Sequence, residues 1–183
     1  MKKIILAILV TACSISQINA QFKFGLKAGA NFNNVKVKEA PATLKVDNLT
    51  GWQAGALLQI KIPAVGIAVQ PELLYTARKF KIDEEKSGIN YFEVPINLQL
   101  GLNLVLLRPY LQAGPYFGYV LNADGENFKD KIDKFDWGIG LGGGLEIWKL
   151  QLDARYSWGL QNVSAKDFQI KNNRFTLSLA YLF

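Results

Sequence analysis

Hydrophobic and polar side chains alternate one by one along most of this chain. The C-terminal segment shows the pattern best: Phe175, Leu177, Leu179, Tyr181 and Phe183 occupy one phase, and Arg174, Thr176, Ser178 and Ala180 the other. Successive side chains of a β-strand point to opposite faces. A period of two therefore predicts a strand with one apolar and one polar face.

The same alternation recurs in seven earlier segments. They cover residues 22–29, 52–60, 67–76, 91–100, 110–119, 136–147 and 151–158. With the last segment, they predict an all-β chain of eight strands. Long polar connections lie near 32–49, 78–88, 121–134 and 161–172, and tight ones near 63–64, 103–105 and 149. Long and tight connections thus alternate along the chain.

This layout predicts a closed eight-stranded antiparallel up-and-down transmembrane β-barrel, because outer-membrane barrels have short periplasmic turns and longer outer loops. An even number of strands places both termini on the periplasmic side. The alternative is a soluble eight-stranded carrier, whose apolar face lines a ligand cavity. The membrane barrel is favoured because aromatic residues lie near strand ends on the apolar face, as interfacial girdles do: Trp52, Tyr75, Tyr119, Trp137, Tyr156, Trp158, Tyr181 and Phe183.

The polar face predicts a charged lumen. An isolated buried charge is very costly, so we expect the inward carboxylates to pair with inward arginines in a structural network. Acid–base catalysis by Glu72 and Glu93, on neighbouring strands, is the less favoured alternative. The expected network consists of Glu72, Glu93, Arg108, Asp136, Glu146, Asp153, Arg155 and Arg174.

Glycine and proline residues within the strands carry further expectations. An eight-stranded barrel is just wide enough for its own side chains. We expect small inward residues to leave room for Tyr110, Tyr116 and the arginines, and these small residues are Gly138, Gly140, Gly142 and Gly144. Each proline removes a backbone donor from a strand. We therefore expect β-bulges or aqueous strand ends at Pro71, Pro95, Pro109 and Pro115.

The N-terminus has the features of a secretory signal peptide. Lys2 and Lys3 precede a short apolar run, and small and polar residues follow up to Ala20. We expect a signal peptide at residues 1–20 and a barrel domain at residues 21–183. A lipoprotein cleavage site at Cys13 is the alternative, although the apolar run before it would be very short.

Charge and composition exclude several functional classes. The formal net charge of +6 includes Lys2 and Lys3, and the basic residues form no stripe, so no nucleic-acid partner is expected. The chain has no histidine, and its single cysteine lies in the expected signal peptide. Classical catalytic triads and zinc sites are therefore not expected, and neither is a cofactor. We predict that the protein is not an enzyme.

One family resemblance can be read from two segments and the C-terminus. Tyr91-Phe92-Glu93-Val94-Pro95-Ile96-Asn97-Leu98 resembles the Tyr-x-Glu-(Val or Ile)-Pro-(Leu or Ile) strand of the PorT-like outer-membrane β-barrel proteins of Bacteroidetes. Phe24-Gly25-Leu26-Lys27-Ala28-Gly29-Ala30-Asn31 is similar to the opening strand of that family. The terminal Phe183 resembles the aromatic residue recognised by the barrel-assembly machinery. The resemblance covers essentially the whole chain from residue 21 and implies a location in the cell outer membrane.

The expected function is a structural or interaction role in the outer membrane. The expected partners are the lipid of that membrane, the barrel-assembly machinery during biogenesis and a secretion-system or surface-protein partner, with the long loops as its contact surface. The family resemblance adds, as an alternative, an accessory role in secretion of surface proteins. A narrow passive channel for small solutes is the second functional class, which the small width of the barrel disfavours.

Overall fold

The computed structural model describes residues 21–38, 46–48, 50–62, 66–82, 85–123, 135–160, 163–165 and 168–183. The expected signal peptide lies outside them. Eight long strands are present in these residues: β1 (Gln21–Lys38), β3 (Thr50–Ile62), β4 (Ile67–Ile82), β5 (Glu85–Gly101), β6 (Leu107–Ala123), β7 (Phe135–Ile147), β8 (Leu150–Gly159) and β10 (Phe168–Leu182). Two strands of three residues are added, β2 (Val46–Asn48) and β9 (Val163–Ala165). The described residues contain no helix that is long and apolar enough to cross a membrane.

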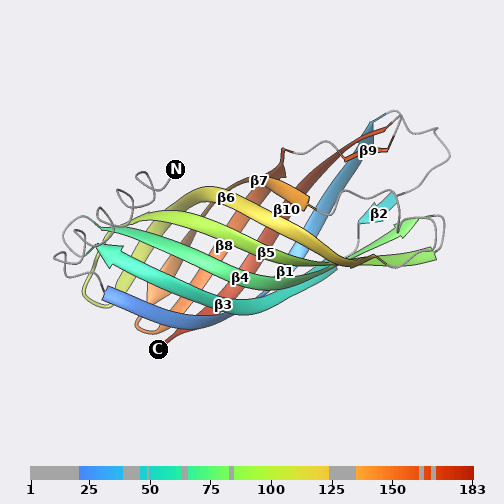
Figure 1. Cartoon of the computed structure of the whole chain (residues 1–183). Helices are drawn as coiled ribbons and strands as arrows, with labels where there is room; N and C mark the ends of the chain where they lie inside the picture. Colours follow the sequence, from blue (N-terminus) through green and yellow to red (C-terminus); the bar gives the residue numbers. More distant parts are fainter. Residues whose placement is uncertain are drawn as a thin grey trace, which may run out of the picture.

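The long strands form a closed barrel (Figure 1). Each pairs in antiparallel fashion with the next long strand along the chain. The first and last strands close the ring, because β1 pairs with β10 from Gly25↔Leu182 to Lys38↔Gln169. The prediction of a closed eight-stranded antiparallel barrel is thus confirmed.

The alternation of side chains decides which face of each strand is inside. In β5, the side chains of Tyr91 and Glu93 are buried, whereas Phe92 and Leu98 are exposed. The outer surface of the other long strands is apolar in the same way, and the interior holds most of the polar side chains. An apolar exterior around a polar interior is the reverse of a soluble barrel and matches a barrel in lipid.

Aromatic side chains surround the barrel near one end. Several of these rings contact each other. The ring centroids of Trp52 and Tyr75 are 5.6 Å apart, and those of Tyr75 and Phe92 are 6.1 Å apart. The strand register places the others on neighbouring strands at similar heights. This girdle consists of Phe32, Trp52, Tyr75, Phe92, Phe117, Tyr119, Phe135, Trp137, Tyr156, Trp158 and Phe175. Such rings mark the boundary between lipid and water in membrane barrels.

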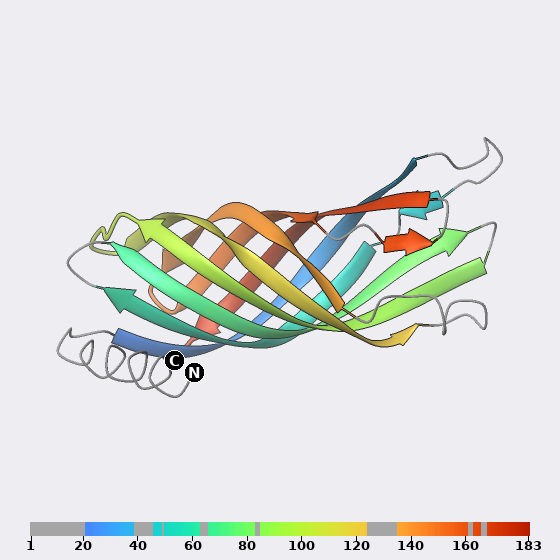
Figure 2. The same cartoon turned by 45° about the horizontal axis from the view of Figure 1, so that its top comes forward.

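Four strands continue past the aromatic girdle. β4 and β5 remain paired as far as Ile82↔Glu85, and β1 and β10 as far as Lys38↔Gln169. β2 and β9 pair with β4 and β10 in the same region, on the right in Figure 2. The prediction of a long polar loop at 78–88 is therefore wrong, because only residues 83 and 84 separate the two strands. Backbone hydrogen bonding between the strands extends the hairpin where the side-chain pattern suggested a loop.

The prolines interrupt strand pairing without shifting its register. The pairs Pro71↔Ile96 and Leu74↔Glu93 lie in one register, and so do Pro95↔Tyr116 and Leu98↔Ala113, although the intervening residues form no pairs. The expectation of bulges at the prolines is therefore wrong, whereas Pro109 lies near a strand end, two residues after β6 begins at Leu107. Among the described strands, the register shift lies between Asn90 and Tyr91.

The opposite end of the barrel carries the short turns. Trp148 and Lys149 alone connect β7 to β8, and Trp148 has a positive φ of 54°. The start and the end of the described chain lie here too, because Gln21 is opposite Lys61 and the Phe183 N–H donates to the Phe24 carbonyl at 2.8 Å. We call this the short-turn end, and the end with the strand extensions the long-loop end.

Candidate functional site

The lumen contains all eight charged residues that the sequence assigns to it. Each lies at an inward position of its strand, and the most exposed of them, Asp136, is only 9% exposed. They come from six strands: Glu72 from β4, Glu93 from β5, Arg108 from β6, Asp136 and Glu146 from β7, Asp153 and Arg155 from β8, and Arg174 from β10. The closed sheet thus gathers residues distant in sequence into one interior.

Lys27 of β1 lies at the centre of the lumen between two carboxylates. Its Nζ is 3.0 Å from Glu72 Oε1 and 2.9 Å from Asp153 Oδ2, and all three side chains are at most 3% exposed. Asn97 Nδ2 donates to Glu72 at 3.0 Å, and Ser178 Oγ donates to Asp153 at 3.1 Å. One cation therefore contacts two anions, and polar donors stabilise both carboxylates.

Arg174 and Glu93 form a bidentate ion pair closer to the long-loop end. Arg174 Nη1 donates to Glu93 Oε1 at 2.5 Å, and Nη2 donates to Oε2 at 2.8 Å. The Arg174 guanidinium also lies 5.4 Å from the ring centroid of Tyr116. Parallel Arg–carboxylate bonds and a ring contact fix the orientation of both side chains.

Glu146 gathers three cations at the short-turn end. Its carboxylate lies 2.6 Å from Lys61 Nζ, 3.2 Å from Lys23 Nζ and 3.6 Å from Arg108 Nη1. Arg108 also donates to the Gly66 carbonyl at 3.1 Å. The two lysines are partly exposed, so this cluster faces water at the mouth of the barrel, unlike the central ion pairs.

Buried amide side chains connect the Glu146 cluster to the centre of the lumen. Gln59 Nε2 donates to Glu146 Oε2 at 3.3 Å, and Gln70 Nε2 donates to Glu72 Oε1 at 2.8 Å. Gln70 Oε1 in turn accepts hydrogen bonds from Gln99 and Gln151, both at 3.0 Å. This amide network joins side chains of four strands.

The inward glycines of β7 make room for large side chains. A Cβ at Gly138 would lie 2.7 Å from the Tyr116 ring, and one at Gly140 would overlap the Arg155 guanidinium. Arg155 Nη2 donates to the Gly114 carbonyl at 3.3 Å, and the sheet thereby anchors the guanidinium. The glycine run therefore serves packing, as the sequence predicted.

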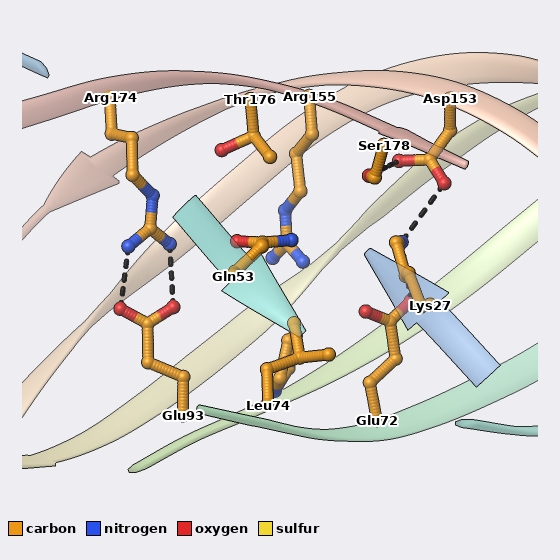
Figure 3. Close-up of a pocket in the computed structure, with 11 residues that line it drawn as sticks. Lys27, Gln53, Glu72, Leu74, Glu93, Asp153, Arg155, Arg174, Thr176 and Ser178 are labelled. Atoms are coloured by element: carbon orange, nitrogen blue, oxygen red, sulfur yellow. Dashed lines mark hydrogen bonds and ion pairs between the residues drawn. The ribbon is translucent and has the colours of Figure 1, made fainter. Parts of the chain in front are cut away.

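Little empty space remains in the central lumen. A cavity of about 10 Å³ lies between the Lys27 group and the Arg174–Glu93 pair (Figure 3). This is about the room that one water molecule needs. Its charged lining is balanced, with three cations, Lys27, Arg155 and Arg174, and three anions, Glu72, Glu93 and Asp153.

The buried ion pairs of the lumen favour a structural role over a catalytic one. Glu72 and Glu93, the alternative acid pair, are each held by a buried cation, Lys27 and Arg174 respectively. Among the described residues, no group of three or more His, Cys, Asp or Glu side chains is placed to hold a metal ion. Ion pairs that are buried and surrounded by hydrogen-bond donors hold strands in position.

Sequence reasoning underrated the lysines and the amides. The arginines were expected to pair with the carboxylates, but Lys27 binds both Glu72 and Asp153. Arg155 donates instead to a backbone carbonyl. The inward phase of the strands was the available signal for Lys27 and for the buried glutamines, which are Gln59, Gln70, Gln99, Gln112 and Gln151.

Comparison with solved structures supports the same architecture. The chain is similar to Ail, the attachment invasion locus protein of Yersinia pestis, which was crystallised in complex with the heparin analogue sucrose octasulfate. The two share 17% identity with a TM-score of 0.52, over 89% of this chain and 99% of Ail. Neisserial surface protein A also matches, at 14% identity and a TM-score of 0.47, over 87% of this chain and 97% of that protein. At 17% identity the likeness to Ail shows the fold alone.

A family model gives the assignment. No curated protein matches the chain significantly. The model described as "Outer membrane protein beta-barrel domain" matches residues 15–165, which is most of the chain. The closed ring of strands, the apolar exterior and the aromatic girdle agree with this match. The chain therefore belongs to the outer membrane protein beta-barrel domain family and is an outer-membrane barrel.

Proposed function

We propose that this protein is an integral outer-membrane barrel with a structural or interaction role, whose strand extensions contact a partner protein at the cell surface. In this arrangement both termini and the short turns face the periplasm. The observation that carries the proposal is the filled lumen, with its central cavity of about 10 Å³. Because the inward side chains of the barrel contact each other, we expect other molecules to bind the strand extensions.

The filled lumen argues against the second candidate, a narrow channel. A solute would have to pass the Arg174–Glu93 pair and the Lys27 group, each of which crosses the lumen between strands. Separating buried charges without new partners costs several kcal/mol. Opening a path for solutes through the lumen is therefore unfavourable.

The extensions supply edges to which an extended peptide can add. Among the described residues, β1 pairs with β3 up to Phe32↔Thr50 and with β10 up to Lys38↔Gln169. In the same part of the chain, β5 pairs with β6 from Ile89 onwards and with β4 from Glu85. A strand edge of this kind can bind another extended segment through main-chain hydrogen bonds. The edges therefore support a protein or peptide partner.

An accessory role in protein secretion is the finer form of this proposal. It rests on the resemblance of the segment 91–98 to the corresponding strand of PorT-like proteins. Fold alone does not determine a partner, so this role depends on finding secretion components in contact with the extensions.

A crosslinked pull-down from the native outer membrane tests the interaction role. We expect a tagged copy to recover a partner in constant proportion, and we expect the partner to be lost when residues 79–88 are replaced by a two-residue turn. Gly118→Ala is the matched control, since a Cβ there meets its neighbours at an ordinary 3.6 Å. A partner retained by the shortened variant would place contact elsewhere, and no recovered partner would contradict the interaction role.

Planar-bilayer recording tests the closed lumen. We expect the purified, refolded protein to show no stable unitary conductance steps, because ion pairs and amides fill its interior. A known porin reconstituted in the same lipid is the positive control. Regular steps from this protein would show an open path and favour the channel.

A further inference from the structure

The turn between β5 and β6 is apolar, although it lies at the end of the barrel. Leu102, Leu104, Val105 and Leu106 are exposed, with Val105 fully exposed and Leu106 78% exposed. Asn103 is the polar residue among them, and no residue from 98 to 107 is charged. Exposed apolar residues that adjoin each other usually mark a contact with lipid or protein.

The apolar turn is continuous with the outer wall of the barrel. Leu98 and Leu100 of β5 point outward and are exposed, and Leu102 follows them in the same phase. Leu111 of β6 lies opposite Leu100 and is also exposed. The wall that faces lipid in an outer-membrane barrel thus runs into the turn without a polar break.

A neighbouring turn indicates where the membrane surface lies at this end. The pair Leu107↔Ile147 places the β5–β6 turn beside Trp148 and Lys149. Lys149 Nζ lies 5.7 Å from the Trp148 ring centroid and 5.8 Å from that of Tyr181. A lysine that lies beside tryptophan and tyrosine rings is typical of the membrane interface.

The backbone of Trp148 supports this position. Its φ of 54° falls in the left-handed region, which is unusual for a bulky residue. Glycine or asparagine normally occupies such a turn position. An interfacial environment suits a tryptophan that is 76% exposed at such a turn.

We propose that the β5–β6 turn is inserted into the membrane leaflet at the short-turn end. The acyl chains of that leaflet cover Leu102, Leu104, Val105 and Leu106. The occupant is lipid because the patch continues the lipid-facing wall and lies level with the Trp148–Lys149 anchor. The proposal rests on the outer-membrane location and is independent of any partner at the long-loop end.

Depth-dependent fluorescence quenching tests the insertion. Cys13 is the only cysteine of the chain, so it is replaced by serine, and Val105→Cys is then labelled with an environment-sensitive dye. Leu98→Cys serves as the lipid-facing control. Gly88→Cys serves as the control in water, because residue 88 lies four residues before Phe92 in β5, on the long-loop side of the aromatic girdle. Each variant is refolded into phosphatidylcholine vesicles with and without brominated acyl chains.

We expect the dye at position 105 to lose as much emission in brominated lipid as the dye at position 98. The dye at position 88 should lose none. If position 105 behaves like position 88 while position 98 is quenched, the turn lies in water and the insertion is wrong. If position 98 is not quenched either, the barrel itself is not in the bilayer, and the outer-membrane assignment fails instead. Faster migration of each unboiled variant on a gel verifies that it has folded.

Discussion

Replacing Lys27 by methionine is expected to destabilise the barrel more than any other single change to its lumen. The substitution leaves the carboxylates of Glu72 and Asp153 buried without their shared cation. Removing one partner of a buried ion pair costs about 3–5 kcal/mol, and here two anions lose the same partner. We expect the free energy of unfolding, measured by urea titration in lipid vesicles, to fall by at least about this amount.

Lys23→Met is the matched control for Lys27→Met. Lys23 lies four residues before Lys27 in β1, closer to the short-turn end. It also binds a carboxylate, but its side chain is 28% exposed. Its partner Glu146 retains Lys61 and Arg108. We expect a loss of about 0–1 kcal/mol, as for exposed ion pairs.

A triple variant separates charge from packing at Lys27. Neutralising both anions, as Glu72→Gln and Asp153→Asn, in the Lys27→Met background should restore much of the lost stability, because the side chains at positions 72 and 153 then carry no buried charge. If Lys27→Met were as stable as the parent protein, or if the triple variant showed no recovery, the central ion pairs would not stabilise the barrel.

Gly140→Val is expected to have the second-largest effect. A Cβ at position 140 would overlap the Arg155 guanidinium, which donates to the Gly114 carbonyl. The arginine would have to leave this position, and the cavity that it lines has a volume of only about 10 Å³. Overpacking of this kind costs about 1–3 kcal/mol and sometimes more. The loss should appear as a lower urea midpoint and as a smaller fraction of rapidly migrating protein on unboiled gels.

Gly118→Val provides the comparison for Gly140→Val. Gly118 is also an inward glycine, in the adjacent strand β6, but a Cβ there meets its nearest atoms at 3.6 Å. We expect a much smaller loss of stability at this position. Equal losses at both sites would show that any side chain on an inward glycine is harmful, and that Arg155 is not the cause.

Local pattern was enough to predict the strands and their faces. Alternation places Phe92 outward and Glu93 inward wherever the strand lies in the barrel, because adjacent side chains always point to opposite faces. The aromatic positions near strand ends indicated a membrane barrel for the same reason. The interior phase of Glu93, Asp153 and Arg174 follows from the same rule, and the structure buries all three.

The prolines and the strand ends show where local pattern fails. Pro71 and Pro95 lack a backbone donor, which suggested bulges, yet the register around them does not shift. The polar sequence at 78–88 suggested a loop, yet β4 and β5 stay paired to Ile82 and Glu85. Both outcomes depend on what the neighbouring strand offers, and side-chain polarity does not report that.

The sequence by itself determined the number of long strands, the face of each side chain and the membrane character of the outer wall. Only the tertiary structure decided which charges meet, how far the strands extend and how much space the lumen retains. Lys27 reaches Glu72, 45 residues away, because strand register and barrel closure place both at one height. Alternation specifies the direction of a side chain but not its height, and height accumulates from register around the whole ring.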